Sequence, residues 1–175
     1  LRSTLDRSGQ LSPALEVDLA MLDTRLAAAQ FELNTEKVWS RNPLAWTYLV
    51  GGGLDLLVSR ETRPMELRAR DLTWRLQGVP ALLSQARASL TDPSQIMQPH
   101  TRVAIGQLGG LRELLEHEIP DRFAGLEPQA RERLLAQVPA ALQALTELEQ
   151  HLQKILPNAT GQWRIGPEGF QEKLR

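Results

Sequence analysis

The residues best suited to bind a ligand lie in a glycine-bounded segment near the end of the chain. Trp163 and Arg164 stand between Gly161 and Gly166. Irregular loops of this kind often carry binding residues, and an arginine guanidinium offers five fixed donors that match a carboxylate, such as the C-terminus of a peptide. We therefore expect Trp163 and Arg164 to bind substrate. The alternative is a packing role, in which Trp163 lies under the last helix and Arg164 pairs with a nearby acid.

The three histidines do not have the spacing of a metal site. His117-Glu118 is the one His-Glu pair, but a zinc-binding helix needs a second histidine four residues after the first, so that both imidazoles lie on one face. Position 121 is Asp instead, and Pro120 interrupts the helix before it. His100 and His151 have no ligand partner at helical spacing. Because cysteine is absent as well, we expect no metal ligand, no cofactor and no catalytic residue in this chain.

Other patterns that accompany catalysis are absent or incomplete. No serine stands in a Gly-x-Ser-x-Gly elbow. Gly51-Gly52-Gly53 is not followed by the Lys-Ser or Lys-Thr of a phosphate loop, and neither is Gly109-Gly110. Glycine in a helix interior costs about 1 kcal/mol against alanine. We therefore interpret both clusters as close helix–helix contacts, with a kink as the alternative at the first. The tryptophans other than Trp163 are expected mostly as core or loop anchors.

Composition excludes several classes of function. The 20 basic and 21 acidic residues give a net charge of -1, whereas nucleic-acid-binding proteins usually carry a basic excess. No apolar run reaches the roughly 18 residues that a membrane-spanning helix needs. We therefore expect no nucleic-acid partner and no membrane span. For the compartment, the cytoplasm is favoured, and a signal peptide trimmed before Leu1 is the alternative.

Prolines and small polar residues divide the chain into helices. Helix starts are predicted at Ser12-Pro13 and Asn42-Pro43, where a side-chain oxygen caps the first turn and proline suits the first helical position, and also near Pro64, Pro99 and Pro128. Apolar residues then recur at steps of three and four, which is the pattern of one buried helix face. In the first helix this stripe is Leu15, Leu19, Leu22, Leu26, Ala29 and Leu33. We expect it to lie in the core.

These segments predict an all-α fold, an antiparallel array of about five to seven long, partly kinked helices with no sheet. The apolar spacing continues through Gly78-Val79-Pro80, which favours one kinked helix there over the alternative of two helices with a tight break. It also continues past Pro139, where we expect a kink. We expect a polar leader over residues 1–11, a helical domain over residues 12–156, and a connector over residues 157–175. The connector opens a helix that we interpret as truncated before a missing carboxy-terminal part, because so short a helix buries little.

Five motifs run through the chain in order. They are Leu22-Asp23-Thr24-Arg25-Leu26 through Phe31-Glu32-Leu33; Trp39 with Asn42-Pro43-Leu44; Val79-Pro80-Ala81-Leu82-Leu83 through Ala86-Arg87-Ala88-Ser89-Leu90; Pro99 through Gly109-Gly110-Leu111; and Gly161-Gln162-Trp163-Arg164-Ile165-Gly166. In this order and spacing they resemble the amino-terminal half of a bacterial family known as domain of unknown function 885. The resemblance covers nearly the whole chain.

The resemblance implies a mostly helical fold similar to the carboxypeptidase Taq-type zinc metallopeptidases. In that group the catalytic His-Glu-x-x-His lies well downstream, so no metal or general-base residue is carried over to this chain. The implied function is an amino-terminal helical domain, a wall or lid of the substrate cleft of a zinc carboxypeptidase-like hydrolase, non-catalytic on its own. Zinc would belong to the full-length protein. The implied partners are the carboxy-terminal remainder and a peptide substrate, and the alternative is a non-enzymatic helical protein-interaction module.

Overall fold

A computed structural model describes residues 12–162 and 164–174 of the chain. All regular structure in these residues is helical, and they contain no strand, so the predicted all-α class is confirmed. The chain divides into two compact units. The main unit is Val38–Arg164, and the small unit comprises the described residues of Leu1–Lys37 and Ile165–Arg175. The predicted partition into leader, helical domain and connector stays a prediction.

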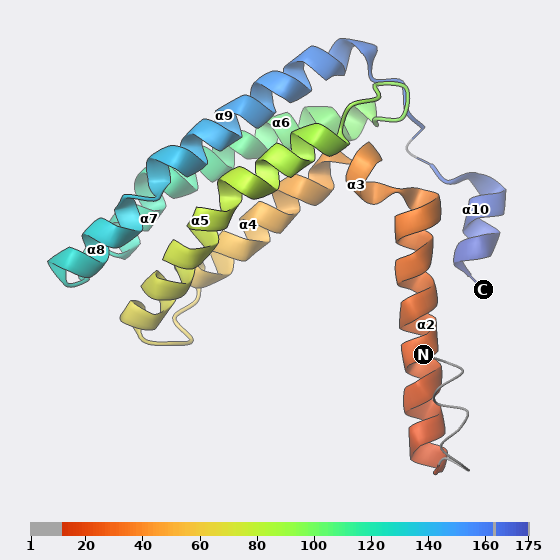
Figure 1. The fold of residues 1–175 in the computed structure, drawn as a ribbon, viewed down its shortest axis with the longest axis horizontal. Helices are drawn as coiled ribbons and strands as arrows, with labels where there is room; N and C mark the ends of the chain where they lie inside the picture. Colours follow the sequence, from red (N-terminus) through yellow and green to blue (C-terminus); the bar gives the residue numbers. More distant parts are fainter. Residues whose placement is uncertain (1–11, 163, 175) are drawn as a thin grey trace. The chain divides into compact units, whose positions relative to one another are not determined.

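Four long helices build the main unit: α4 (Pro43–Ser59), α5 (Met65–Ser89), α6 (Gln98–Glu113) and α9 (Val138–Ile155). Helices α5 and α6 each pack against both α4 and α9, which closes a four-helix ring (Figure 1). Helices α4 and α6 begin, and α5 and α9 end, at the same end of this bundle. Successive long helices therefore run antiparallel, as the sequence predicts. With the long helix of the small unit, the described residues hold five long helices, the lower end of the expected number.

Shorter elements connect the long helices. Helix α3 (Val38–Arg41) precedes α4, a π-helical turn (Leu114–Glu118) and α7 (Ile119–Arg122) extend α6, and α8 (Pro128–Leu135) leads into α9. All five predicted helix starts are confirmed to within one residue. The predictions failed at two prolines. Pro120 lies inside the extension of α6 and does not stop it, and Pro139 lies in the first turn of α9, so two helices replace one kinked helix.

The position of Pro139 in the first turn of α9 has a physical reason. Proline lacks the backbone N–H, and the first turn of a helix is the place where that group has no partner in the helix. The chain turns at residues 136 and 137 and begins α9 with this residue. By contrast, α5 continues through Pro80 without a break. The sequence prediction of one helix across Gly78-Val79-Pro80 is therefore confirmed.

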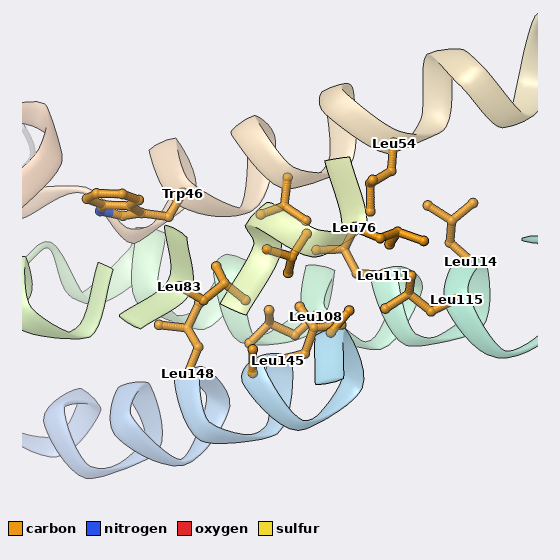
Figure 2. Packing of buried hydrophobic residues seen from close by; sticks show 14 of the residues in the cluster. Trp46, Leu54, Leu76, Leu83, Leu108, Leu111, Leu114, Leu115, Leu145 and Leu148 are labelled. Carbon is orange, nitrogen blue, oxygen red and sulfur yellow. The ribbon is translucent and has the colours of Figure 1, made fainter. Parts of the chain in front are cut away.

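The core of the main unit lies along the axis of the four-helix ring. Leucine side chains from all four helices meet there, and most of them are fully buried (Figure 2). The labelled core residues are Trp46, Leu54, Leu76, Leu83, Leu108, Leu111, Leu114, Leu115, Leu145 and Leu148. Each such leucine removes enough apolar surface from water to contribute about 1.5–3 kcal/mol. This packed core holds the four helices together and so positions the segments at the ends of the bundle.

One charged side chain is buried with this core. Arg68 of α5 is 5% exposed, and its guanidinium lies 5.4 Å from the centre of the Phe123 ring. Its Nη1 donates to the carbonyl oxygens of Leu57 at 3.0 Å and Val58 at 3.3 Å. The last carbonyls of a helix have no partner within the helix. Arg68 therefore caps the C-terminal end of α4 from a neighbouring helix.

The small unit consists of α2 (Pro13–Phe31), a π-helical turn (Glu32–Glu36) and α10 (Gly166–Lys173). Lys173 of α10 makes an ion pair of 2.6 Å with Glu36 and places its ammonium 5.7 Å from the centre of the Phe31 ring. Phe31 is the one buried residue of α2. Helix α10 therefore contacts the carboxy-terminal end of α2.

The leucine stripe of α2 is exposed, and the expectation that it lies in the core was wrong. Leu22 is 59% exposed and Leu26 is 50% exposed, while Leu19 is only partly covered. The spacing identified the apolar face correctly, but spacing does not show what covers a face. Among the described residues no helix is long and apolar enough to cross a membrane. The stripe is an exposed apolar surface of α2.

The two glycine clusters were also misinterpreted. A Cβ atom on Gly51 would lie 3.6 Å from Leu111, an ordinary contact, and a Cβ on Gly52, Gly53, Gly109 or Gly110 would meet no atom within 4 Å. Helices α4 and α6 do pack against each other. Most of these glycines, however, face open space and do not lie in the contact between α4 and α6.

Candidate functional site

The predicted site residues follow a short extended segment, residues 159–162, which we call the strap. The strap lies on the loop that joins α5 to α6. Thr160 donates its backbone N–H to the carbonyl of Pro93 at 3.0 Å, and Gly161 donates to that of Ile96 at 2.9 Å. Ala159 at the start of the strap is 4% exposed. Backbone hydrogen bonds and burial therefore hold the strap against the bundle end where α4 and α6 begin.

Gly161 allows the strap to approach this closely. A Cβ atom at this position would lie 2.2 Å from the carbonyl oxygen of Gln95 and 2.7 Å from that of Ile96. Both contacts are far shorter than any real Cβ contact, and both involve backbone atoms that cannot rotate away. Only glycine satisfies this geometry without moving the chain. The first glycine of the predicted binding segment is therefore required by packing.

Arg41 joins three segments at the same bundle end. Its Nη2 donates to the carbonyl of Gln162 at 2.9 Å, and its Nε lies 3.5 Å from the carbonyl oxygen of Gln95. Its own carbonyl accepts the N–H of Met97 at 3.2 Å. Because a guanidinium binds carbonyls through several fixed donors, Arg41 orients the strap relative to α3 and the α5–α6 loop.

Two tryptophans anchor α3 beside this network. The rings of Trp39 and Trp46 meet edge to face, with centroids 5.2 Å apart, and the indole Nε1 of Trp46 donates to the carbonyl of Trp39 at 2.9 Å. Trp46 is 4% exposed, whereas Trp39 is 41% exposed. Trp46 is thus a core anchor as expected. Trp39 leaves part of an aromatic surface open at the bundle end that carries the strap.

Arg164 is exposed and follows the strap by two residues within the main unit. Trp163, the other predicted site residue, lies outside the described residues. Arg41 was not predicted, because the sequence around it reads only as the end of a connector before the cap at Asn42. No sequence signal distinguishes it from the other arginines. Its role follows from the folding of three distant segments onto one another.

The charge of this bundle end comes from side chains. Two helices begin there and two end there, so the positive and negative ends of their macrodipoles offset one another. Arg41 and Arg164 both belong to this end and add positive charge. Arginine binds carboxylates in bidentate geometry. This bundle end therefore combines guanidinium groups with the partly exposed ring of Trp39.

A second hollowed surface was not predicted. Trp74 of α5 is 79% exposed, which contradicts its expected anchoring role. It borders one hollow of about 680 Å³ that Arg133 also lines, and another of about 530 Å³ that Leu49 and Leu82 line. This surface could not be predicted, because an exposed tryptophan and a buried one look alike in the helical pattern.

The histidines are not grouped as a ligand set: His100 lies in the first turn of α6, at the bundle end that carries the strap, whereas His117 lies in the extension of α6. His151 places Nε2 2.7 Å from the carbonyl oxygen of Leu90, and His117 makes a 3.8 Å contact with Glu113 on the next helical turn. Within the described ranges no three His, Asp or Glu side chains are grouped as metal ligands. The absence of a metal or cofactor from this chain stays a prediction.

Comparison with known proteins adds one finding. The family model described as "Bacterial protein of unknown function (DUF885)" matches residues 1–175. Searches of curated proteins and of solved structures find no match. The ordered motifs that suggested this family include Trp39, Asn42-Pro43-Leu44 and Gly161-Gln162, which the fold gathers at one end of the main unit. The chain belongs to the DUF885 family of bacterial proteins.

Proposed function

We propose that this chain is a substrate-binding helical domain of a metallopeptidase-like protein and is not catalytic on its own. In this proposal the bundle end with the strap forms part of the wall of a substrate cleft. Arg164 binds the terminal carboxylate of a peptide, and Trp163 lines the same site. The proposed partners are the peptide and the carboxy-terminal remainder of the same protein.

The observation that carries the proposal is the fixed position of the strap. Gly161 lies directly on the Gln95 and Ile96 carbonyls, and Arg41 holds the carbonyl of Gln162. A binding side chain is most effective when the backbone beneath it is already ordered, because little entropy is then lost on binding. Arg164 lies two residues beyond Gln162 in the sequence and is exposed.

Zinc, which the resemblance implies, has no set of ligands among the described residues. The contribution of this chain to a peptidase reaction is therefore positioning. A carboxylate held by an arginine fixes the distance of the scissile bond from the peptide end, and correct placement of a substrate can supply several kcal/mol toward the barrier. No chemical step is assigned to a residue of this chain.

The test is steady-state kinetics of the full-length protein. Short peptides with a free C-terminal carboxylate are compared with the same peptides amidated at the C-terminus. We expect hydrolysis of the free acids, and a fall of tenfold or more in kcat/KM for Arg164→Ala, which corresponds to about 1.4 kcal/mol of transition-state binding.

The matched control is Arg122→Ala, which removes an exposed arginine from α7 at the opposite end of the bundle. It should leave kcat/KM unchanged. Thermal stability is measured for both variants, because a loss of activity that follows a loss of stability would assign Arg164 a packing role. No hydrolysis of any peptide, or equal kcat/KM for wild type and Arg164→Ala, would refute the proposal.

A second candidate function is a non-enzymatic protein-interaction module. One observation favours it, the exposed leucine stripe of α2. This surface lies on a different unit from the strap. The two functions therefore make separate predictions.

A further inference from the structure

The apolar stripe of α2 has the spacing of a coiled-coil seam. Leu15, Leu19, Leu22, Leu26 and Ala29 follow one another at alternating steps of four and three. With Leu15 at position d of the heptad, these residues occupy successive d and a positions. Such a seam buries itself by inserting its side chains between those of a second helix. The repeat spans most of α2, whose bounds are Pro13 and Phe31.

Among the residues that the structure describes, none of the small unit buries this seam. Leu15 is 52% exposed, Leu22 is 59% exposed and Leu26 is 50% exposed. Helix α10 contacts the other end of α2, at Phe31 and the turn that follows it. Contiguous apolar surface of this kind marks an interaction site in soluble proteins, and an isolated helix of this length is only marginally stable in water. A second helix packed on this face would bury the seam and stabilise α2.

The residues beside the seam define the charge of that partner. Positions e and g flank the seam and choose partners through their charges. In α2 these positions carry Glu16, Asp18, Asp23 and Arg25, together with the neutral Gln30. Neither Glu16 nor Asp18 makes an ion pair with a described residue. The seam thus has an acidic border.

A second copy of α2 does not complement this border. In a parallel pair, Asp18 of one copy would face Asp23 of the other. In an antiparallel pair with Leu22 opposite Leu26, Arg25 would face Arg25 and Asp23 would face Asp23. With Leu22 opposite Leu19 instead, Arg25 would face Asp18, but Glu16 would face Asp23. Each of these arrangements brings like charges together, which disfavours pairing. The charge pattern therefore selects a different helix over self-association.

We propose that α2 binds a helix with a leucine-type seam that is bordered by lysine or arginine. The leucines of the two helices interdigitate, and the basic side chains of the partner face Glu16 and Asp18. This interaction is independent of peptide binding at the strap. It gives the chain a docking surface for a basic amphipathic helix.

The experiment uses two synthetic helices of about three heptads, with leucine at every a and d position. One probe carries lysine at e and g, and the other carries glutamate there. Fluorescence anisotropy with the 175-residue chain should show at least tenfold tighter binding of the lysine probe. Added salt should weaken this binding, because screening acts on exposed charges. The double variant Glu16→Lys with Asp18→Lys should lose the preference.

Two further variants test whether the lysine probe binds at the seam. Leu22→Asp places a charge in the seam and should abolish binding of the lysine probe, while Val17→Asp alters an equally exposed residue outside the seam and should leave it intact. Circular dichroism confirms that each variant keeps its helices. Equal affinity for both probes, no binding of either, or a stable dimer of the chain in sedimentation would overturn the proposal.

Discussion

At the scale of single residues, Gly161 and Gly52 show that one residue type serves opposite purposes. A side chain on Gly161 would collide with backbone atoms of the α5–α6 loop, whereas one on Gly52 would extend into open space. Gly161 is therefore constrained by packing, and Gly52 carries the helix-propensity cost of glycine without a contact that requires it. The sequence alone could not separate them, because the atoms that crowd Gly161 belong to Gln95 and Ile96, far away in the sequence.

Gly161→Ala should lower the free energy of unfolding by about 1–3 kcal/mol, the usual cost of forcing an extra methyl group into a packed site. The change should also weaken hydrogen-exchange protection at Gly161, whose N–H donates to Ile96. The matched control is Gly52→Ala, which should raise stability by up to about 1 kcal/mol. Urea denaturation measures both. Destabilisation of equal size in the two variants would show that close approach is not the cause.

Leucines at the same helical spacing should differ sharply in their contribution to stability. Leu72→Ala removes a fully buried side chain of the main unit and should cost about 2–5 kcal/mol. Leu22→Ala removes a largely exposed side chain of α2 and should change stability by no more than about 0.5 kcal/mol. Denaturation midpoints of the two variants decide this. A large loss for Leu22→Ala would mean that the stripe is buried in solution.

At the scale of elements, the residues at which helices begin could be predicted from the sequence, but the elements that each helix packs against could not. Ser12 and Asn42 cap the helices that follow them, with hydrogen bonds to Leu15 and Leu44, and a cap is a local signal that a few residues contain. The covering of a face depends on elements distant in sequence. The stripe of α2 and the core stripe of α5 therefore look alike in sequence but differ in burial.

The hairpin between α4 and α5 carries an ion-pair cluster with a predictable pH response. The hydrogen bond from Arg70 is the main cause that holds the pKa of Asp71 below its ordinary value of 3.8. Desolvation opposes it, and the charge of Arg63, 2.7 Å away, acts in the same direction as the Arg70 hydrogen bond. A carboxyl whose pKa is lowered by folding stabilises the fold above its unfolded pKa. That contribution is lost as pH falls through the folded pKa.

Asp71→Asn should therefore be less stable than wild type at neutral pH, by an amount that does not vary above about pH 5 and shrinks below about pH 4. Urea midpoints of both proteins across this range measure the difference. Because the partner arginines Arg63 and Arg70 are 48% and 68% exposed, added salt should reduce the difference as well. A gap between the two proteins that persists unchanged into strong acid would contradict the assignment.

At the scale of the whole molecule, the sequence predicted the fold class, the helix starts and the family, but only part of the candidate site. Arg164 was identified from its residue type and its glycine-bounded segment. Arg41 and the carbonyls of Gln95 and Ile96 were not, because they meet only when three segments fold onto one bundle end. The chemistry of a single residue can be read from the sequence, whereas a site that is assembled from distant segments cannot be.

The central claim is that the bundle end with the strap recognises a peptide carboxylate through Arg164. Isothermal titration of the chain with peptides of identical sequence, one a free acid and one amidated, tests it most directly. The account predicts that wild type binds the free acid at least tenfold tighter, a difference of about 1.4 kcal/mol, and that Arg164→Gln binds both peptides equally weakly. Equal affinity of wild type for the two peptides, or an unchanged preference in Arg164→Gln, would contradict it.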